Sequence, residues 1–119
     1  MLEKIAWMNL LNDFYGQLLT ERQRSFMELY YGQNLSLGEI AAEFAVTRQA
    51  VHDTLKRAEQ LLEEYEKKLG LVAKFKKEKN KLVEACSLLD DYAVTKEDNK
   101  IKRAREILNE IIELTFSPD

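Results

Sequence analysis

Helix-start signals recur along this chain and leave little room for any other secondary structure. Thr20 is followed three residues later by Gln23, and Ser36 by Glu39, so both pairs match the capping box that opens an α-helix. Thr47 can cap a further helix with its hydroxyl oxygen. Alternating runs of β-branched residues, which would indicate strands, are nearly absent. The sequence therefore predicts an all-α protein.

Apolar residues at helical spacing predict the extent of these helices. The expected helices cover residues 2–19, 21–31, a short stretch after Ser36, residues 48–69, residues 72–90 and a last stretch around Ile101 to Leu114. Gly70 is expected to end the long fourth helix. Thr95, with Asp98, is expected to cap the last helix, residues 90–95 to form a hinge, and residues 117–119 to fray. We expect a helix-turn-helix domain over residues 1–70 and a two-helix extension over residues 71–119.

The long helix predicted for residues 48–69 carries a narrow apolar seam. Its apolar side chains alternate in steps of four and three: Val51, Leu55, Ala58, Leu62, Tyr65 and Leu69. Such spacing suits packing against another helix. Because a small helix-turn-helix covers only the first two turns, we expect the remainder to pack against the C-terminal segment or a second subunit. The seam therefore predicts a homodimer.

Length and composition set the class of the protein. The 119 residues allow one domain with a core, or a small domain with an appended helical unit. With 45% hydrophobic and 33% charged residues, the chain suits a soluble helical protein. Neither an apolar run of about 20 residues nor a secretory signal is evident, so we expect a cytoplasmic location and no membrane insertion.

Metal and catalytic chemistry find little support in the sequence. His52 is the sole histidine and Cys86 the sole cysteine, which leaves too few ligands of the usual kinds for a metal site. Cys86 shares a face with Leu82 and Leu89, so we expect a buried structural thiol. No phosphate-binding loop or nucleophile motif occurs. We expect no catalytic residues, no cofactor and no enzymatic activity.

The segment from Ser36 to Val51 has the pattern of a helix-turn-helix. A short capped helix is followed by a tight turn at residues 45–47 and then by a helix whose polar first turns can enter the major groove. Ala41 and Ala50 are small enough to let the two helices approach closely. Arg can pair with guanine or phosphate, Gln with adenine, and Asp can accept from cytosine. The candidate DNA-binding residues are Arg22, Arg24, Ser36, Thr47, Arg48, Gln49, His52, Asp53, Lys56 and Arg57.

Five runs in this region also carry a family resemblance. They are MN at 8–9, DFY at 13–15, MELYY at 27–31, LSLGEIA at 35–41 and RQAV at 48–51. Their order is similar to region four of bacterial sigma factors, and the first 75 or so residues resemble the YlxM family of helix-turn-helix proteins. The resemblance implies a sigma-like fold, a gene neighbourhood with signal recognition particle components, and a regulatory or accessory role there. Thr47 replaces an expected Ser, and His52 replaces an expected Tyr at a groove-facing position.

The charge distribution leaves two alternatives open beside double-stranded DNA as the partner. The net charge of −3 argues mildly against a tight nonspecific DNA binder. One alternative is that the helix-turn-helix fold serves protein contact. The other is an adaptor that binds a protein or RNA of the signal recognition particle through the extension. A possible RNA or phosphate patch there, which could also be a plain solvated face, consists of Lys74, Lys76, Lys77, Lys79 and Lys81.

Overall fold

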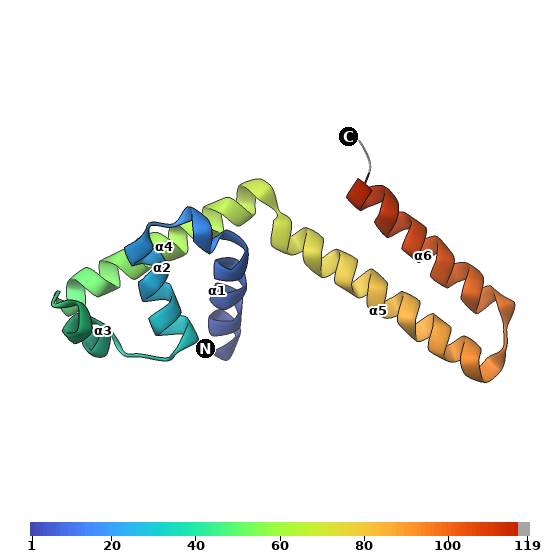
Figure 1. The fold of residues 1–119 in the computed structure, drawn as a ribbon, viewed down its shortest axis with the longest axis horizontal. Coiled ribbons are helices and arrows are strands. Elements are labelled where there is room, and N and C mark those ends of the chain that lie inside the picture. The colour runs from blue at the N-terminus through green and yellow to red at the C-terminus, as the bar shows by residue number, and fades with distance from the viewer. Residues whose placement is uncertain (117–119) are drawn as a thin grey trace. The chain divides into compact units, whose positions relative to one another are not determined.

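The computed structural model describes the backbone of residues 1–116 and the side chains of residues 1–114. In chain order the elements are α1 (Leu2–Tyr15), a 3-10 turn η1 (Gly16–Leu18), α2 (Glu21–Met27), a π-helical turn η2 (Glu28–Gly32), α3 (Leu37–Phe44), α4 (Arg48–Leu69), α5 (Leu71–Thr95) and α6 (Asp98–Phe116) (Figure 1). No strand occurs within residues 1–116, which confirms the all-α prediction. The expected frayed end, residues 117–119, lies outside the described residues.

The chain divides into two compact units. Unit 1 comprises Met1–Val72, and unit 2 begins at Ala73. Unit 1 contains α1 to α4 and the first two residues of α5, and its core draws apolar side chains from all of these elements. Tyr15, Phe26, Leu62 and Val72 are among its largest fully buried side chains. Unit 1 is therefore a packed helical unit with a core of its own.

The helix starts in unit 1 form as their sequences predict. Ser36 Oγ accepts a hydrogen bond from the Glu39 backbone N–H at 3.1 Å, and Glu39 Oε1 accepts from the Ser36 N–H at 2.9 Å. Thr20 and Gln23 form the same reciprocal pair at the start of α2. Thr47 Oγ1 accepts the backbone N–H three residues further along, at 3.0 Å. These bonds satisfy N–H groups that have no partner inside the helix, so both capping boxes and the Thr47 cap are confirmed.

The turn between α3 and α4 depends on a left-handed residue. Ala45 ends α3 with φ 55° and ψ 44°, and the Val46 N–H then bonds back to the Ala41 oxygen at 3.1 Å. A residue with a Cβ rarely adopts this conformation, which costs roughly 1–2 kcal/mol. The turn therefore sets the direction in which α4 begins, and this direction requires backbone strain at Ala45.

We expect Ala45→Gly to stabilise the protein by about 0.5–1 kcal/mol. Relief of the left-handed strain, roughly 1–2 kcal/mol, exceeds the extra backbone entropy that Gly brings to the unfolded chain, about 0.5–1 kcal/mol. Thermal unfolding followed by circular dichroism should shift upward by a few degrees. The matched control is Ala42→Gly, at an exposed position inside α3, which should destabilise by about 1 kcal/mol. A loss of stability in both variants would contradict the strain argument.

Most of the α4 seam is buried by other helices of unit 1 and not by the expected partners, although Leu69, its last residue, is 55% exposed. Val51, Leu55, Ala58 and Leu62 are all buried, as predicted. Along the later turns of α4, however, the covering side chains come from α1: Trp7 Nε1 donates to Glu63 Oε1 at 2.8 Å, and the rings of Tyr15 and Tyr65 lie 6.0 Å apart. The expectation that this part packs against the C-terminal segment or a second subunit was therefore wrong, and the seam gives no evidence for a dimer.

A buried hydrogen-bond cluster, the Tyr15 clamp, joins the end of α4 to the start of α5. The Tyr15 hydroxyl donates to Glu66 Oε1 at 2.6 Å and accepts from the Leu71 backbone N–H at 3.0 Å. Glu66 Oε1 also accepts from the Val72 N–H at 3.0 Å. Burial and the hydrogen bond to Glu66 raise the pKa of Tyr15, so its hydroxyl stays protonated as a donor. The clamp thereby satisfies the N–H groups that follow Gly70, which ends α4 at φ 63° as predicted.

Two helix boundaries differ from the sequence prediction. The first helix ends at Tyr15 rather than residue 19, because Leu19 is extended, with ψ 160°, to lead into the Thr20 cap. The expected hinge at residues 90–95 is also wrong, since α5 continues to Thr95 and the break lies at Lys96, with φ 60°. Thr95 does not cap the last helix either. Its hydroxyl donates to the oxygen of Asp91 at 3.0 Å and accepts from the Glu97 N–H at 3.3 Å, so it links the end of α5 to the residue before α6.

Unit 2 is a hairpin of two antiparallel helices with a small core. In Figure 1, α5 and α6 lie side by side, and the buried residues between them are Ala85, Ala104 and Ile107. Lys81 Nζ lies 2.7 Å from Glu110 Oε2 and so links the two helices. Cys86 is exposed, so the expectation of a buried thiol was wrong: it lies one position beyond buried Ala85, on a side of α5 that α6 does not cover.

Candidate nucleic-acid interface

The first turns of α4 present an exposed polar surface. We call it the recognition face, and it consists of Arg48, Gln49, His52, Asp53, Lys56 and Arg57. All six side chains are exposed, while Val51 and Leu55 between them are buried and anchor the helix. Ala50 is also exposed, so it does not mediate the close approach to α3 that the sequence suggested. Ala41, on α3, is buried as expected.

Asp53 holds two neighbours on the recognition face. Its Oδ1 accepts a hydrogen bond from Gln49 Nε2 at 2.8 Å and lies 3.4 Å from His52 Nδ1. The Gln49 amide keeps its carbonyl oxygen and its second N–H, and adenine is read by such an acceptor and donor pair. Asp53 therefore restricts the rotation of the one side chain on this face that suits adenine.

Arg48 lies over the first turn of α3. A Cβ built on Gly38 would be 3.7 Å from Arg48 Nε and 3.9 Å from Ser36 Oγ, so the three residues are close neighbours. The hydroxyl of Ser36 accepts the capping bond from the Glu39 backbone N–H. Hydrogen bonds from Ser36 also lower the pKa of the Glu39 carboxyl. A cation and the N–H end of a helix thus meet where the two helices join, which suits contact with a phosphate or with the acceptor edge of a guanine.

Arg22 and Arg24 of α2 are separated from this junction. The Arg22 guanidinium lies 5.7 Å from the ring centre of Phe26 and 5.8 Å from that of Phe44, within cation–π range of both. Phe44 ends α3, whereas Arg48 lies over the start of α3. Arg22 and Arg48 therefore contact opposite ends of an eight-residue helix that is about 12 Å long. Arg24 is half-buried. The structure therefore does not gather all the predicted basic residues at one point.

A shallow groove beside the recognition face contains residues that the sequence did not single out. The groove, about 190 Å³, is lined by His52 and Lys56 together with Lys4 of α1 and Tyr30 of η2. Lys4 Nζ lies 3.3 Å from a carboxylate oxygen of Glu59. No local pattern in the sequence identifies Lys4, because its position depends on how α1 packs against α4. A cation from α1 thus lies beside the recognition face.

Glu59 also accepts a hydrogen bond that fixes η2 against α4. The Tyr31 hydroxyl donates to Glu59 Oε2 at 2.8 Å. Burial, followed by the hydrogen bond to Glu59, raises the pKa of Tyr31 far above its ordinary value near 10, so the hydroxyl remains a donor. The bond supports the helix that carries the recognition face.

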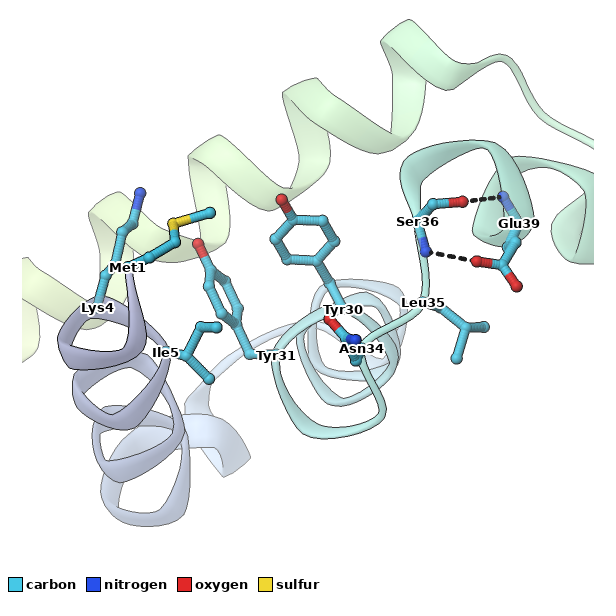
Figure 2. Close-up of a pocket in the computed structure, with 9 residues that line it drawn as sticks. All are labelled: Met1, Lys4, Ile5, Tyr30, Tyr31, Asn34, Leu35, Ser36 and Glu39. Atoms are coloured by element: carbon cyan, nitrogen blue, oxygen red, sulfur yellow. Dashed lines mark hydrogen bonds between the residues drawn. The ribbon is translucent and has the colours of Figure 1, made fainter.

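A second cavity, of about 300 Å³, lies between α1, η2 and the start of α3 (Figure 2). Figure 2 shows Ile5 of α1 facing Tyr31, and the capping bonds between Ser36 and Glu39 at the other end of the cavity. Its hydrogen-bonding groups at Tyr31, Ser36 and Glu39 already have protein partners. The cavity is therefore a gap between packed elements more than a preorganised ligand site.

The predicted lysine patch does not form one surface. Lys74, Lys76, Lys77 and Lys79 are exposed on α5, but successive residues turn by about 100°, so these four point to different sides of the helix. Lys81 is half-buried and bonds to Glu110, whose pKa it lowers. The lysines thus give α5 a basic beginning but no single basic stripe.

The described residues offer no sign of metal or membrane chemistry. Within residues 1–114 no three His, Cys, Asp or Glu side chains are grouped as metal ligands would be. None of the helices up to residue 116 combines the length and the apolar character needed to cross a bilayer.

Known proteins are similar to this chain over most of its length. The model of the family UPF0122, described as "Putative helix-turn-helix protein, YlxM / p13 like", matches residues 2–107. A UPF0122 protein of Desulforamulus reducens is 59% identical over 106 residues, which cover 89% of this chain and 91% of the relative. One from Halalkalibacterium halodurans is 54% identical over 97 residues, covering 82% and 89% of the two chains. One from Bacillus mycoides is 52% identical over 100 residues, covering 84% and 91%.

Proposed function

Because this chain belongs to UPF0122, the YlxM / p13-like family of helix-turn-helix proteins, we propose that it is a non-enzymatic, cytoplasmic regulator that binds double-stranded DNA through α4. The observation that carries this proposal is the exposure of the whole recognition face on a helix that Thr47 caps and buried Val51 and Leu55 anchor. A helix held in this way can place its polar first turns in the major groove without rearrangement. We assign DNA binding to the domain of residues 1–70.

The side chains divide into base-reading and phosphate-binding groups. Those proposed to face the groove are Arg48, Gln49, His52, Asp53 and Lys56. Those proposed to lie near phosphates are Arg22, Arg24, Ser36, Thr47 and Arg57. Phosphate contacts position the protein on the duplex, whereas base contacts give it sequence preference. Because the chain carries a net charge of −3, base contacts must supply an appreciable share of the affinity.

Selection from random duplex DNA at two salt concentrations tests the proposal. A DNA-binding regulator should enrich a common sequence, and its affinity for that sequence should fall as salt rises because phosphate contacts release counterions. Enrichment with no salt dependence would exclude the phosphate contacts. Failure of both would reject the DNA-binding function.

We expect Asp53→Asn to bind unselected DNA several-fold more tightly at low salt. The substitution removes a carboxylate that repels phosphates and loosens the restraint on Gln49, so the preference for the selected sequence over a scrambled duplex should also fall. Fluorescence anisotropy with both duplexes measures the two effects. The matched control is Glu64→Gln, the same loss of charge at an exposed position two turns further along α4 than Arg57. Asp53 has no role at the interface if the two variants behave alike.

The second candidate function is an adaptor that binds a protein or RNA of the signal recognition particle through residues 71–119. The exposed lysines at the beginning of α5 favour it. In the full chain, Lys74→Glu with Lys77→Glu should then abolish capture of that partner and leave DNA binding unchanged. A chain that binds no DNA but retains capture would favour the adaptor over the regulator. A homodimer stays part of either proposal, since two copies would present two α4 helices to paired half-sites.

A further inference from the structure

The hairpin of unit 2 leaves most of its apolar side chains exposed. Within residues 73–114 only three side chains are buried, whereas several large apolar ones are between 38% and 53% exposed, among them Phe75, Leu82, Leu89, Ile101, Leu108 and Ile112. Two helices alone cannot bury both of their apolar faces, and stable helical units stack further helices on them. The hairpin therefore resembles two helices of a four-helix bundle whose other two helices are missing.

These exposed side chains form one continuous surface. On α5 the stripe of Phe75, Leu82 and Leu89 lies roughly a quarter-turn from the residues that contact α6, at about 100° per residue. On α6 the stripe of Ile101, Leu108 and Ile112 lies roughly a quarter-turn from the residues that contact α5, in the same sense along the chain. About each helix axis, the exposed stripe is turned by a similar angle, and in the same sense along the chain, from the residues that contact the other helix. Because the two helices are antiparallel, these turns place both stripes on the same side of the hairpin. We call this side the hairpin face.

We propose that the hairpin face binds the hairpin face of a second copy of this chain, giving a four-helix bundle in which the two α5 helices lie antiparallel and adjacent. The paired helices are about 30 Å long and together about 20 Å wide, so pairing along their whole length buries on the order of 1,200 Å² in total, with the apolar stripes, roughly 17–21 Å long, at its centre. That area reaches the lower end of the range for stable, specific interfaces. The proposal needs no DNA and does not depend on the DNA-binding function.

The charge distribution favours a second copy as the partner. On α5, residues 71–81 contain five lysines and one glutamate, whereas residues 82–95 contain three acidic residues and no basic ones. On α6, residues 98–105 contain four basic residues and one aspartate, whereas residues 106–114 contain three acidic residues and no basic ones. Each helix thus begins basic and ends acidic. Any two antiparallel neighbours in the bundle therefore place opposite charges side by side.

The α5 stripe and the α6 stripe indicate nearly the same level along the hairpin for the two-fold axis that relates the two copies. The contact between Lys81 and Glu110 sets the relative height of the helices, so the point between residues 84 and 85 of α5 is level with the point between residues 106 and 107 of α6. The first point lies two to three residues beyond Leu82, the middle of the α5 stripe, and the second lies at the middle of the α6 stripe. A single two-fold axis through this level therefore aligns both stripes with their counterparts.

With the two-fold axis at this level, one pair of opposite charges meets at two symmetry-related places in the dimer. Lys79 and Asp90 are exposed at one edge of the α5 stripe, on the side away from α6, and each is five to six residues from the level of the axis. In the antiparallel pair, Lys79 of one copy faces Asp90 of the second copy, and the reverse contact forms by symmetry. These two ion pairs would set the register of the dimer.

Sedimentation equilibrium of the full chain, without DNA, tests the proposal. The protein should be a dimer at micromolar concentration, and Leu82→Glu with Leu108→Glu should make it monomeric. Lys79→Glu and Asp90→Lys should each raise the dimer dissociation constant about tenfold, because each replaces two attractive contacts with two repulsive ones. The double variant Lys79→Glu with Asp90→Lys should restore dimerisation, which also establishes that the hairpin of the single variants can fold. The matched control is Asp91→Lys, the same charge change on the opposite side of α5, which should dimerise normally.

Two results would overturn the proposal. One is a monomer throughout the micromolar range. The other is a double variant whose loss of dimer affinity equals the sum of the losses in the two single variants. Lys79 and Asp90 would then not meet in the dimer. Neither result would bear on DNA selection by unit 1.

Discussion

Arg48→Ala together with Gln49→Ala is expected to lower affinity for the selected DNA at least thirtyfold while leaving the helical content unchanged. A well-formed bidentate contact between such a side chain and a base contributes about 1–3 kcal/mol, so two contacts give about 2–6 kcal/mol. Both side chains are exposed on α4, and neither contributes to the core. Anisotropy titrations at fixed salt measure the affinity, and circular dichroism measures the helical content.

A matched pair on the same helix separates base contact from general effects. Gln60 and Lys68 are exposed on α4 beyond the recognition face, and their replacement by alanine removes one amide and one cation. This control should bind the selected DNA with nearly the affinity of the parent chain. Unchanged affinity in the Arg48 and Gln49 variant would mean that the first turns of α4 do not read DNA.

Tyr15→Phe is expected to destabilise the protein by about 1–3 kcal/mol. The Tyr15 side chain is only 1% exposed, and its hydroxyl serves Glu66 and the Leu71 N–H at once. Phe fills the same space but removes this hydroxyl, so the part-buried Leu71 N–H loses its partner, which costs about 1–3 kcal/mol, whereas Glu66 Oε1 keeps the Val72 N–H. Urea denaturation gives the change in free energy of unfolding.

Tyr92→Phe is the matched control for the Tyr15 clamp. Tyr92 is half-buried in α5, and the ring that faces Lys96 is retained in the variant. Its loss of stability should stay within about 0.5 kcal/mol, as for most surface changes. If Tyr15→Phe and Tyr92→Phe both lowered the free energy of unfolding by an equally small amount, the Tyr15 clamp would not stabilise the protein.

Features set by neighbouring residues could be predicted from the sequence. The caps at Thr20, Ser36 and Thr47 are hydrogen bonds over three residues, so the pattern alone identifies them. The helix end at Gly70 is likewise local. Thr95 shows the limit of this approach, because a threonine hydroxyl can bond back into the preceding helix as well as cap the next one.

Features set by long-range packing could not be predicted. The sequence shows that the α4 seam must be covered, but which helix covers it depends on contacts across more than 50 residues, such as that of Trp7 with Glu63. Cys86 was expected to be buried because it shares a stripe with Leu82 and Leu89, yet that stripe lies on the exposed side of the hairpin. A periodic pattern identifies an apolar side of a helix but not its partner.

The candidate site was predictable to the same extent. The exposed turns of α4 follow from subtracting the seam, and the bond between Gln49 and Asp53 follows the usual spacing of four residues on a helix. The position of Arg22 over Phe26 and Phe44 does not, because it requires α2 and the end of α3 to meet.

The hydrogen bond from Trp7 to Glu63 has a practical consequence for measuring how this protein unfolds. Trp7 is the only tryptophan in the chain, and its indole lies within unit 1. Its fluorescence therefore follows the melting of that unit alone, whereas far-ultraviolet dichroism sums over every helix. Coincident transitions from the two signals would mean that both units melt as one cooperative block, and separate transitions would mean that the hairpin melts independently.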